Sequence, residues 1–318
     1  MTSPETLRRR ATIASVATAL TLVAAKLGAY IATDAISLLS SLIDSTVDAL
    51  ASVVTLIGVR RALKPADRMH RFGHGKSEPV AALAQAFFIT GSAVLLGYEA
   101  ANRLVNPEPV RESAIGVAVM VFAILATLLL VTYQNHVIRR TESVAIGADA
   151  VHYRGDLFMN VAVIAALLLT DLTGIVYFDP VFALGISAYL IRSAWGISRT
   201  SLDILMDREL GAEQRELVER IVEAHPETRG LHDLRTRSSG DRIFIEFHLE
   251  LDEHLTLAQA HDITDQVEAE IAQAFGNAEV LAHQEPAGLE DERRDARLRA
   301  ADSARAERER GRPAPTAG

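Results

Sequence analysis

Residues 36–60 read ISLLSSLIDSTVDALASVVTLIGVR, an apolar segment with Asp44 and Asp48 in its middle. A segment of this length can cross a bilayer as a helix, and four residues rise by ~6 Å along one helix face. A charge at the bilayer centre costs roughly 2.5–3.5 kcal/mol on insertion scales. The two carboxylates therefore predict a compensating partner, and a divalent metal ion is the leading candidate.

The composition bounds the class of protein. The 318 residues are 49% hydrophobic, and the mean hydropathy is +0.16. These values indicate a membrane region joined to a soluble region. Because the chain has no cysteine, any metal site must use carboxylate oxygen and imidazole nitrogen. The net charge of −9 is spread over both halves and gives no reason to expect nucleic acid as a partner.

Apolar segments of bilayer-spanning length fill the first two thirds of the chain. We expect six of them, at roughly residues 11–32, 36–60, 79–103, 113–138, 145–170 and 178–199. Arg and Lys are concentrated in the basic N-terminus, in every second connection between the segments and at the end of the last segment. These positions all lie on one side of the membrane, so the positive-inside rule predicts that both ends of the region are cytoplasmic. No A-x-A-type cleavage pattern follows the first apolar run, so we expect a retained span and not a signal peptide.

A small soluble domain is predicted after Asp207. Its alternating and helical patterns give the order αββαβ, which is typical of a two-layer α+β domain with helices on one face of a sheet. Residues 287–318 are charged and almost without apolar content, and we expect them to be disordered. The expected elements are a helix with the apolar stripe Leu217, Ile221 and Ala224, strands near 231–236 and 243–251, a helix opened by a capping box at Thr256 and Gln259, and a strand near 279–283.

The fifth apolar segment offers the partner that Asp44 and Asp48 require. It contains ADAVHYRGDLFMN, residues 148–160, in which His152 and Asp156 are again four residues apart. Two such pairs on two membrane helices supply three carboxylates and one imidazole, which suits a tetrahedral ion such as zinc. The alternative is a structural polar cluster between helices, but both pairs together in a membrane favour metal ligation.

The loop after the second segment reads PADRMHRFGHGKSEP, residues 65–79. Asp67, His70 and His74 can converge on an ion there, with Gly73 and Gly75 permitting the turns. On spacing alone, a basic loop with solvated histidines is the favoured interpretation.

Four histidines and a glutamate mark the soluble domain. These are His232, His248, His261 and His283, with Glu285 just beyond. They could form a second metal site, which could be binuclear, or they could be scattered surface histidines, and the residues alone favour neither. The remaining histidines at 136, 225 and 254 are expected to be structural or solvated.

These motifs together resemble the cation diffusion facilitator family, most closely its bacterial zinc and ferrous-iron efflux branch. The resemblance covers roughly residues 8–286. It is carried by L-x-D-S-x-x-D in the second segment, D-x-x-H-x-F-G-H-G-K in the loop, H-Y-x-x-D in the fifth segment, and H-D-L-R-T-R and H-Q-E-P in the soluble domain.

The resemblance implies a homodimer with six helices per protomer and a ferredoxin-like, metallochaperone-like cytoplasmic domain. A family member carries Asp where this chain has Glu285, and the longer stem is expected to shift metal affinity more than it abolishes binding. The implied sites are a transport site (Asp44, Asp48, His152, Asp156), a loop site (Asp67, His70, His74), a binuclear site at the dimer interface (His232, His248, His261, His283, Glu285) and an interdomain ion pair (Lys76, Asp207).

The resulting domain hypothesis has four parts. They are a cytoplasmic N-terminal segment (1–10), a six-helix transmembrane transport domain (11–206), a cytoplasmic metal-binding dimerisation domain (207–286) and a disordered tail (287–318).

The functional hypothesis is a metal/proton antiporter, and not an enzyme, that exports divalent cations by alternating access. Zn²⁺ is the expected ion, both transported and regulatory, with Fe²⁺, Cd²⁺ and Co²⁺ as further candidates, and no organic cofactor is expected. The expected location is a bacterial inner membrane, with both termini cytoplasmic. Two alternatives are an intramembrane hydrolase, which the spacing of the aspartates disfavours, and a membrane-anchored metal sensor without transport.

Overall fold

The computed structural model describes residues 3–34, 36–107 and 114–288, together with residues 297, 300–301 and 303–304. The chain divides into two compact units, Met1–Met206 and Asp207–Gly318. Most of the predicted tail, residues 287–318, lies outside the described residues.

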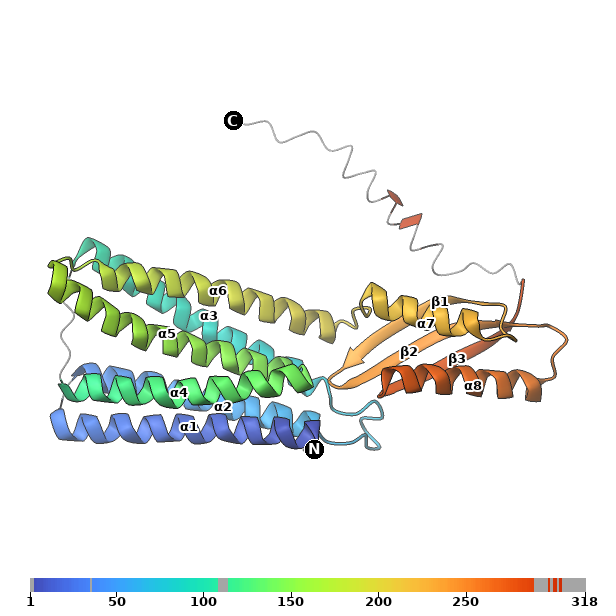
Figure 1. Ribbon diagram of the computed structural model, residues 1–318, viewed down its shortest axis with the longest axis horizontal. Helices are drawn as coiled ribbons and strands as arrows, with labels where there is room; N and C mark the ends of the chain where they lie inside the picture. Colours follow the sequence, from blue (N-terminus) through green and yellow to red (C-terminus); the bar gives the residue numbers. More distant parts are fainter. Residues whose placement is uncertain are drawn as a thin grey trace, which may run out of the picture. The chain divides into compact units, whose positions relative to one another are not determined.

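The first unit is helical, as predicted (Figure 1). Within the described residues, six helices are long and apolar enough to cross a membrane. Several of these helices extend beyond the predicted apolar segments, because charged residues continue the helical turns past the hydrophobic window. The helices are α1 (Pro4–Thr33), α2 (Ile36–Ala62), α3 (Ser77–Val105), α4 (Ala114–Thr141), α5 (Val144–Thr173) and α6 (Phe178–Leu205).

Helix α5 occupies the centre of this unit, since it contacts each of the other five helices. Helix α1 packs along α2, and α3 packs along α6. Small residues allow the close approaches: a Cβ on Gly58 of α2 would lie 2.3 Å from Cβ of Ala81 on α3. The fold thus brings the two segments that carry the predicted ligands, α2 and α5, into contact.

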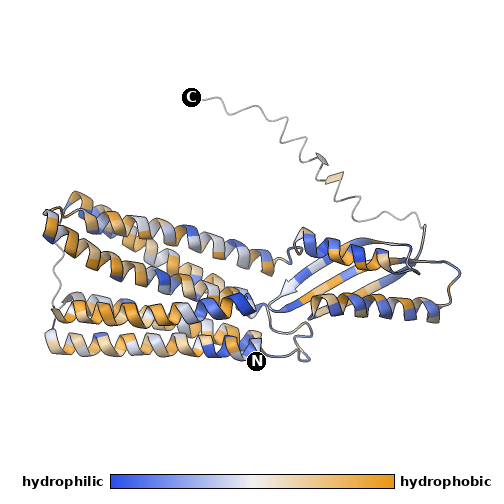
Figure 2. Ribbon diagram, viewed as in Figure 1, coloured by the Kyte–Doolittle hydropathy of each residue, from blue (hydrophilic) through white to orange (hydrophobic). Residues whose placement is uncertain are grey.

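Hydrophilic residues gather at one end of these helices. Figure 2 shows blue ribbon where α1 begins and where α4 ends, with mainly orange ribbon between the helix ends. The last turns of α2 and α4 each carry two arginines, Arg60 with Arg61 and Arg139 with Arg140. This distribution has the asymmetry that the positive-inside rule associates with a cytoplasmic face.

The second unit has the predicted αββαβ order. Strand β1 pairs antiparallel with β2, and β2 pairs parallel with β3, so that β2 is central. Helices α7 and α8 contact each other and the sheet, so the two helices cover one face (Figure 1). The elements are α7 (Ala212–Ala224), β1 (Gly230–Ser239), β2 (Arg242–Leu251), α8 (Leu257–Phe275) and β3 (Ala278–Pro286).

The core of the second unit forms between the sheet and the two helices. Ile245, Phe247 and Leu249 of β2 are almost fully buried, which confirms the predicted alternation. Helix α8 opens with the predicted capping box at Thr256 and Gln259.

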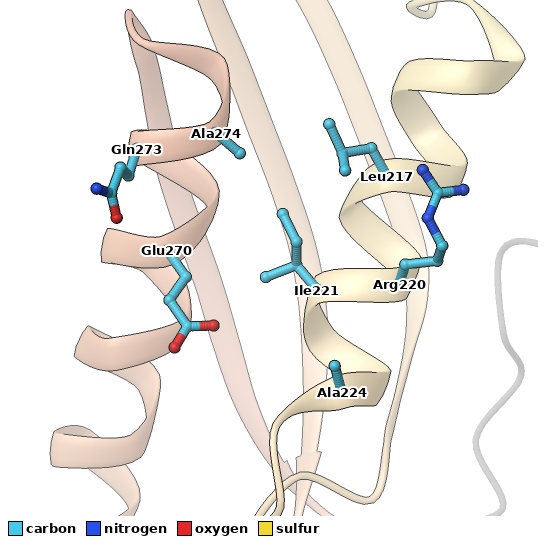
Figure 3. Close-up of a pocket in the computed structure, with 7 residues that line it drawn as sticks. All are labelled: Leu217, Arg220, Ile221, Ala224, Glu270, Gln273 and Ala274. Carbon is cyan, nitrogen blue, oxygen red and sulfur yellow. The ribbon is translucent and has the colours of Figure 1, made fainter.

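The predicted stripe of α7 is offset from the buried one. Val218 and Val222 are fully buried, whereas Leu217, Ile221 and Ala224 line a groove of about 440 Å³ between α7 and α8 (Figure 3). The apolar face of α7 is broader than one i, i+4 row. Val218 and Val222 lie at the centre of this face and pack into the core.

Candidate metal centres

The first candidate centre lies between α2 and α5. Nε2 of His152 is 2.8 Å from Oδ1 of Asp48 and 3.8 Å from Oδ2 of Asp156. The His152 side chain is 6% exposed, against 21% for Asp48 and 36% for Asp156, so the group is buried on one side and open on the other. One ligand atom from each residue lies within 4.8 Å of the others, which is the spacing of a shared metal ion.

Asp44 is not part of this trio within the described residues. It lies one turn before Asp48 on α2 and is exposed. The structure therefore brings together three of the four predicted ligands, from both helices.

Asp149 belongs to a different polar cluster, one turn before His152 on α5. Its carboxylate accepts hydrogen bonds from Nε2 of Gln85 (2.8 Å), Nε2 of Gln134 (2.8 Å) and Oγ of Ser52 (3.3 Å). The hydroxyl of Tyr153 lies 2.9 Å from Oγ of Ser52. Asp149 is 1% exposed, and its partners come from α2, α3 and α4. Asp149 therefore belongs to a structural polar cluster between helices, which was the alternative to metal ligation. His152 and Asp156 are arranged as metal ligands would be.

The second candidate centre is in the loop between α2 and α3. One oxygen of Asp67 lies 3.3 Å from Nδ1 of His70 and the other lies 3.4 Å from Nε2 of His74. The same carboxylate accepts from the amides of Met69 (2.8 Å) and His70 (2.7 Å), and these bonds, led by that of His70, lower the pKa of Asp67. Gly73 has φ of +81°, as the predicted turn requires.

The loop residues fit a divalent ion. Asp67, His70 and His74 have ligand atoms within 4.8 Å of one another. Nδ1 of His74 is buried and, among the described residues, has no hydrogen-bond partner. The other ring nitrogen of His74, Nε2, faces the Asp67 carboxylate and is the atom that could bind an ion together with Asp67.

The third candidate centre follows from the register of the C-terminal sheet. His232 pairs with His248 across β1 and β2, and His248 pairs with His283 across β2 and β3. The ring centroids are 5.0 Å apart in each pair; the rings of His232 and His248 are tilted to each other, and those of His248 and His283 meet edge to face. Three histidines that are distant in sequence therefore form one row on the polar face of the sheet.

Glu285 bridges this row. One carboxylate oxygen is 2.6 Å from Nδ1 of His248 and the other is 3.2 Å from Nε2 of His232. Nε2 of His283 is 3.6 Å from Oε1 of Glu285, and that histidine is 69% exposed. The longer stem of Glu285 thus spans two imidazoles, and the donor set fits a first-row divalent ion.

Glu250 orients one of the candidate ligands. Its Oε1 is 2.9 Å from Nδ1 of His232, whose other ring nitrogen faces Glu285. A carboxylate on the far nitrogen of an imidazole is the usual outer contact of a metal-ligating histidine. The sequence held a signal for this residue, because Glu250 shares the polar face of β2 with His248.

His261 lies apart from the histidine row. It is on α8, largely exposed, with Nδ1 3.5 Å from Oδ1 of Asp265. Of the other histidines, His225 is buried, whereas His136 and His254 are exposed.

The interdomain pair stays a prediction. Nζ of Lys76 donates to the carbonyl of Leu205 at 3.4 Å. The carboxylate of Asp207 is 3.6 Å from the Arg237 guanidinium.

Lys26 was not identified from the sequence as a residue near the candidate transport site. Its Nζ donates to Oγ of Ser45 at 2.6 Å and to the carbonyl of Ser41 at 3.2 Å, both on α2. A single lysine inside the first apolar segment was the signal that could have identified it.

Within the described residues, six helices of membrane-spanning length and three groups of ligand-like Asp, Glu and His side chains define a multi-pass membrane protein with candidate metal centres. Two family profiles match the chain: a cation efflux transmembrane domain over residues 12–206 and a cation efflux protein cytoplasmic domain over residues 210–287. The chain belongs to the cation efflux family, whose members are transporters and not enzymes.

Curated relatives cover almost the whole chain. The cation-efflux pump FieF of Shewanella oneidensis is 47% identical over 277 residues, which are 87% of this chain and 93% of the relative. FieF of Klebsiella pneumoniae is 45% identical over 280 residues, or 88% of this chain and 93% of the relative.

Solved structures match a shorter part of the chain. The zinc form of the transporter CzrB is 34% identical and covers 27% of this chain and 99% of its own, with a TM-score of 0.26. The metal-bound C-terminal domain of the CzcD transporter from Thermotoga maritima is 26% identical, covers 25% of this chain and 93% of its own, and has a TM-score of 0.24.

Proposed function

We propose that this protein is a metal/proton antiporter that exports Zn²⁺ from the cytoplasm by alternating access. The observation that carries the proposal is the group of Asp48, His152 and Asp156 at the contact of α2 and α5. Asp44, one turn away, would complete four ligands if its side chain turned inward when the ion binds. Three oxygens and one nitrogen suit zinc, and Fe²⁺, Cd²⁺ and Co²⁺ are further candidates.

Proton exchange follows from the donor chemistry. Imidazole and carboxylate must be deprotonated to ligate, so ion binding releases protons, and protonation expels the ion. His152 is the proposed proton carrier because histidine is the side chain whose unperturbed pKa lies near neutral pH. Its short contact with Asp48 means that a proton on Nε2 occupies the atom that would otherwise face the metal.

We assign transport to residues 11–206 and regulation to residues 207–286. The proposed assembly is a homodimer in a bacterial inner membrane, with both termini cytoplasmic. The basic ends of α2 and α4 support this orientation. Protons are the proposed counter-substrate, and lipid is the proposed contact of exposed apolar side chains such as Phe87 and Trp195.

The C-terminal unit is the proposed metal sensor. Zn²⁺ at His232, His248, His283 and Glu285 would favour one arrangement of two protomers, which links the metal level to the transport rate. His261 is exposed on α8 and would join such a site from the partner of a dimer. The loop residues Asp67, His70 and His74 form a proposed further metal site.

A flux assay tests the proposal. The full chain is reconstituted in vesicles that contain a zinc indicator or a pH dye, and zinc entry is compared with proton movement. We expect the two fluxes to be coupled and opposite, and both to vanish in His152→Ala. Zinc flux that persists in His152→Ala, or that moves no protons, would refute the mechanism.

A membrane-anchored sensor without transport is the alternative function. It requires the histidine row of the C-terminal unit but not the buried group on α2 and α5. Zinc binding by residues 208–286 without zinc flux in the full chain would favour the sensor. The buried ligand-like group favours transport, because a sensor gains nothing from it.

A further inference from the structure

Lys26 places a positive charge beside the candidate transport site. It lies on α1, which packs along α2, and its side chain is half-buried. A lysine in a membrane helix ordinarily extends its stem so that the ammonium reaches the interface. Here Nζ is instead held against α2, by Oγ of Ser45 at 2.6 Å and by the carbonyl of Ser41 at 3.2 Å.

The two anchoring serines share a helix face with a candidate ligand. Ser41, Ser45 and Asp48 follow the i, i+4, i+7 spacing, and Ser45 directly follows Asp44. Ser45 is 4% exposed, so its hydroxyl is a fixed acceptor inside the bundle. The ammonium therefore stays on the side of α2 that carries the acidic ligands.

The ammonium acts on the site by charge and not by ligation. Burial inside the bundle disfavours the charged form of the Lys26 side chain, and the nearby carboxylates of Asp156, Asp48 and Asp44 favour it. Within the described residues, no ion pair of 4 Å or less joins Lys26 to these carboxylates. A charge at this range attracts the carboxylates of the metal-free site and repels a divalent ion.

We propose that Lys26 is a built-in counter-cation of the transport site. This proposal rests on the proposed transport function. Lys26 offsets part of the negative charge of the three carboxylates when no metal is bound, and it repels the metal ion when one is bound. The site is thereby kept from holding its cargo too tightly, and release is favoured over retention. Lys26 is a positioning residue in this account, since it does not touch the ion.

The test compares variants of the full chain in vesicles at one fixed pH near neutrality. Lys26→Met should lower the KM for zinc roughly tenfold, the size expected for a unit charge at intermediate dielectric. It should also lower kcat, because release becomes slow. Lys26→Arg, which keeps the charge, should resemble the wild type, and Lys64→Met, at an exposed lysine after α2, is the matched control.

A merely structural lysine would behave differently. Lys26→Met would then raise KM while it lowers kcat, or leave both unchanged, and either result would overturn the proposal. Ser45→Ala provides a second variant in case Lys26→Met does not fold, since it releases the tether and keeps the charge. A smaller fall in KM is expected for Ser45→Ala, and an increased KM would contradict the proposal.

Transport and the role of Lys26 can be tested separately, by zinc flux and by equilibrium zinc binding. Wild-type vesicles that carry no zinc would refute transport. Equilibrium zinc binding to the purified full chain would still decide the role of Lys26, because tighter binding by Lys26→Met is expected whether or not the ion crosses the membrane. A zinc affinity of Lys26→Met equal to or weaker than that of the wild type would show that Lys26 is not a counter-cation of the site.

Discussion

Nε2 of His152 on α5 lies 2.8 Å from Oδ1 of Asp48 on α2. This contact joins the two helices at the only group of three ligand-like side chains that the described membrane helices contain. The contact uses the nitrogen that would face a metal ion. A metal ion and a proton therefore compete for Nε2 of His152 and the facing oxygen of Asp48.

The ligand group predicts a large loss of zinc affinity in Asp48→Ala. The substitution removes one of the three converging donors, and even outer-shell losses cost roughly 10–100-fold in metal affinity. We expect a loss of at least roughly 100-fold in equilibrium zinc binding to the purified full chain. Glu99→Ala removes a carboxylate near the end of α3 and serves as the control. Equal affinities of Asp48→Ala and the wild type would remove Asp48 from the site.

We expect substitution of Asp149 to lower the stability of the fold and not to remove a metal ligand. Asp149→Leu leaves the amides of Gln85 and Gln134 without their shared acceptor inside the bundle, which should lower the free energy of unfolding by about 2–4 kcal/mol. Asp149→Asn keeps an acceptor oxygen and should cost much less. Denaturant unfolding in detergent measures both, and a Leu variant as stable as the Asn variant would contradict the hydrogen-bonded role.

The lowered pKa of Asp67 predicts a pH-dependent loop. A depressed aspartate pKa means that the carboxylate stabilises the loop above its ordinary pKa of 3.8 and that this contribution is lost as pH falls through the lower value. The amide of His70, which donates to Asp67, should therefore lose protection from hydrogen exchange at acid pH. Asp67→Asn should show weaker protection without this pH dependence. Protection that persists unchanged at acid pH in the wild type would contradict the assignment.

We expect the zinc affinity of the C-terminal unit to depend on the length of the Glu285 side chain. Glu285→Asp shortens the stem, so one carboxylate should no longer reach both His232 and His248, and zinc affinity should fall roughly tenfold. Titration calorimetry on residues 208–286 measures this affinity, and His261→Ala should leave it unchanged in the dilute monomer. An unaffected Glu285→Asp variant would show that Glu285 does not bridge.

Zinc should also stabilise this unit against heat. Binding to the folded state alone adds about 2.7 kcal/mol at a free zinc concentration of 100 Kd. The unfolding temperature of residues 208–286 should therefore rise with zinc and return after chelation. His248→Ala should show little of this rise, and an equal rise in that variant would place the bound zinc elsewhere.

Much of the architecture was predictable because its determinants are local. Apolar segments of spanning length predict the membrane helices, and alternation in β2 predicts the two faces of the sheet. Helix ends were less accurate: α1 begins at Pro4, with Ser3 as its cap, because the helix continues through charged residues before the apolar window. The stripe on α7 was offset, since burial of Val218 and Val222 depends on α8 and the sheet.

The sites were predictable to the extent that their residues are close in sequence. Pairs four apart on one helix can be read directly, whereas the pairing of His232, His248 and His283 depends on strand register. Register is a tertiary property that short spacing does not contain. Asp149 and Lys26 were not assigned because their roles depend on partners from other helices, such as Gln134 and Ser45.

Simultaneous recording of zinc and proton flux, in vesicles that contain the full chain, tests antiport directly. Zinc entry should be accompanied by opposite proton movement, and His152→Ala should abolish both fluxes. A proton gradient alone should drive zinc uphill through the wild type. Zinc flux that is independent of the proton gradient, or that continues in His152→Ala, would rule out zinc/proton antiport at this site.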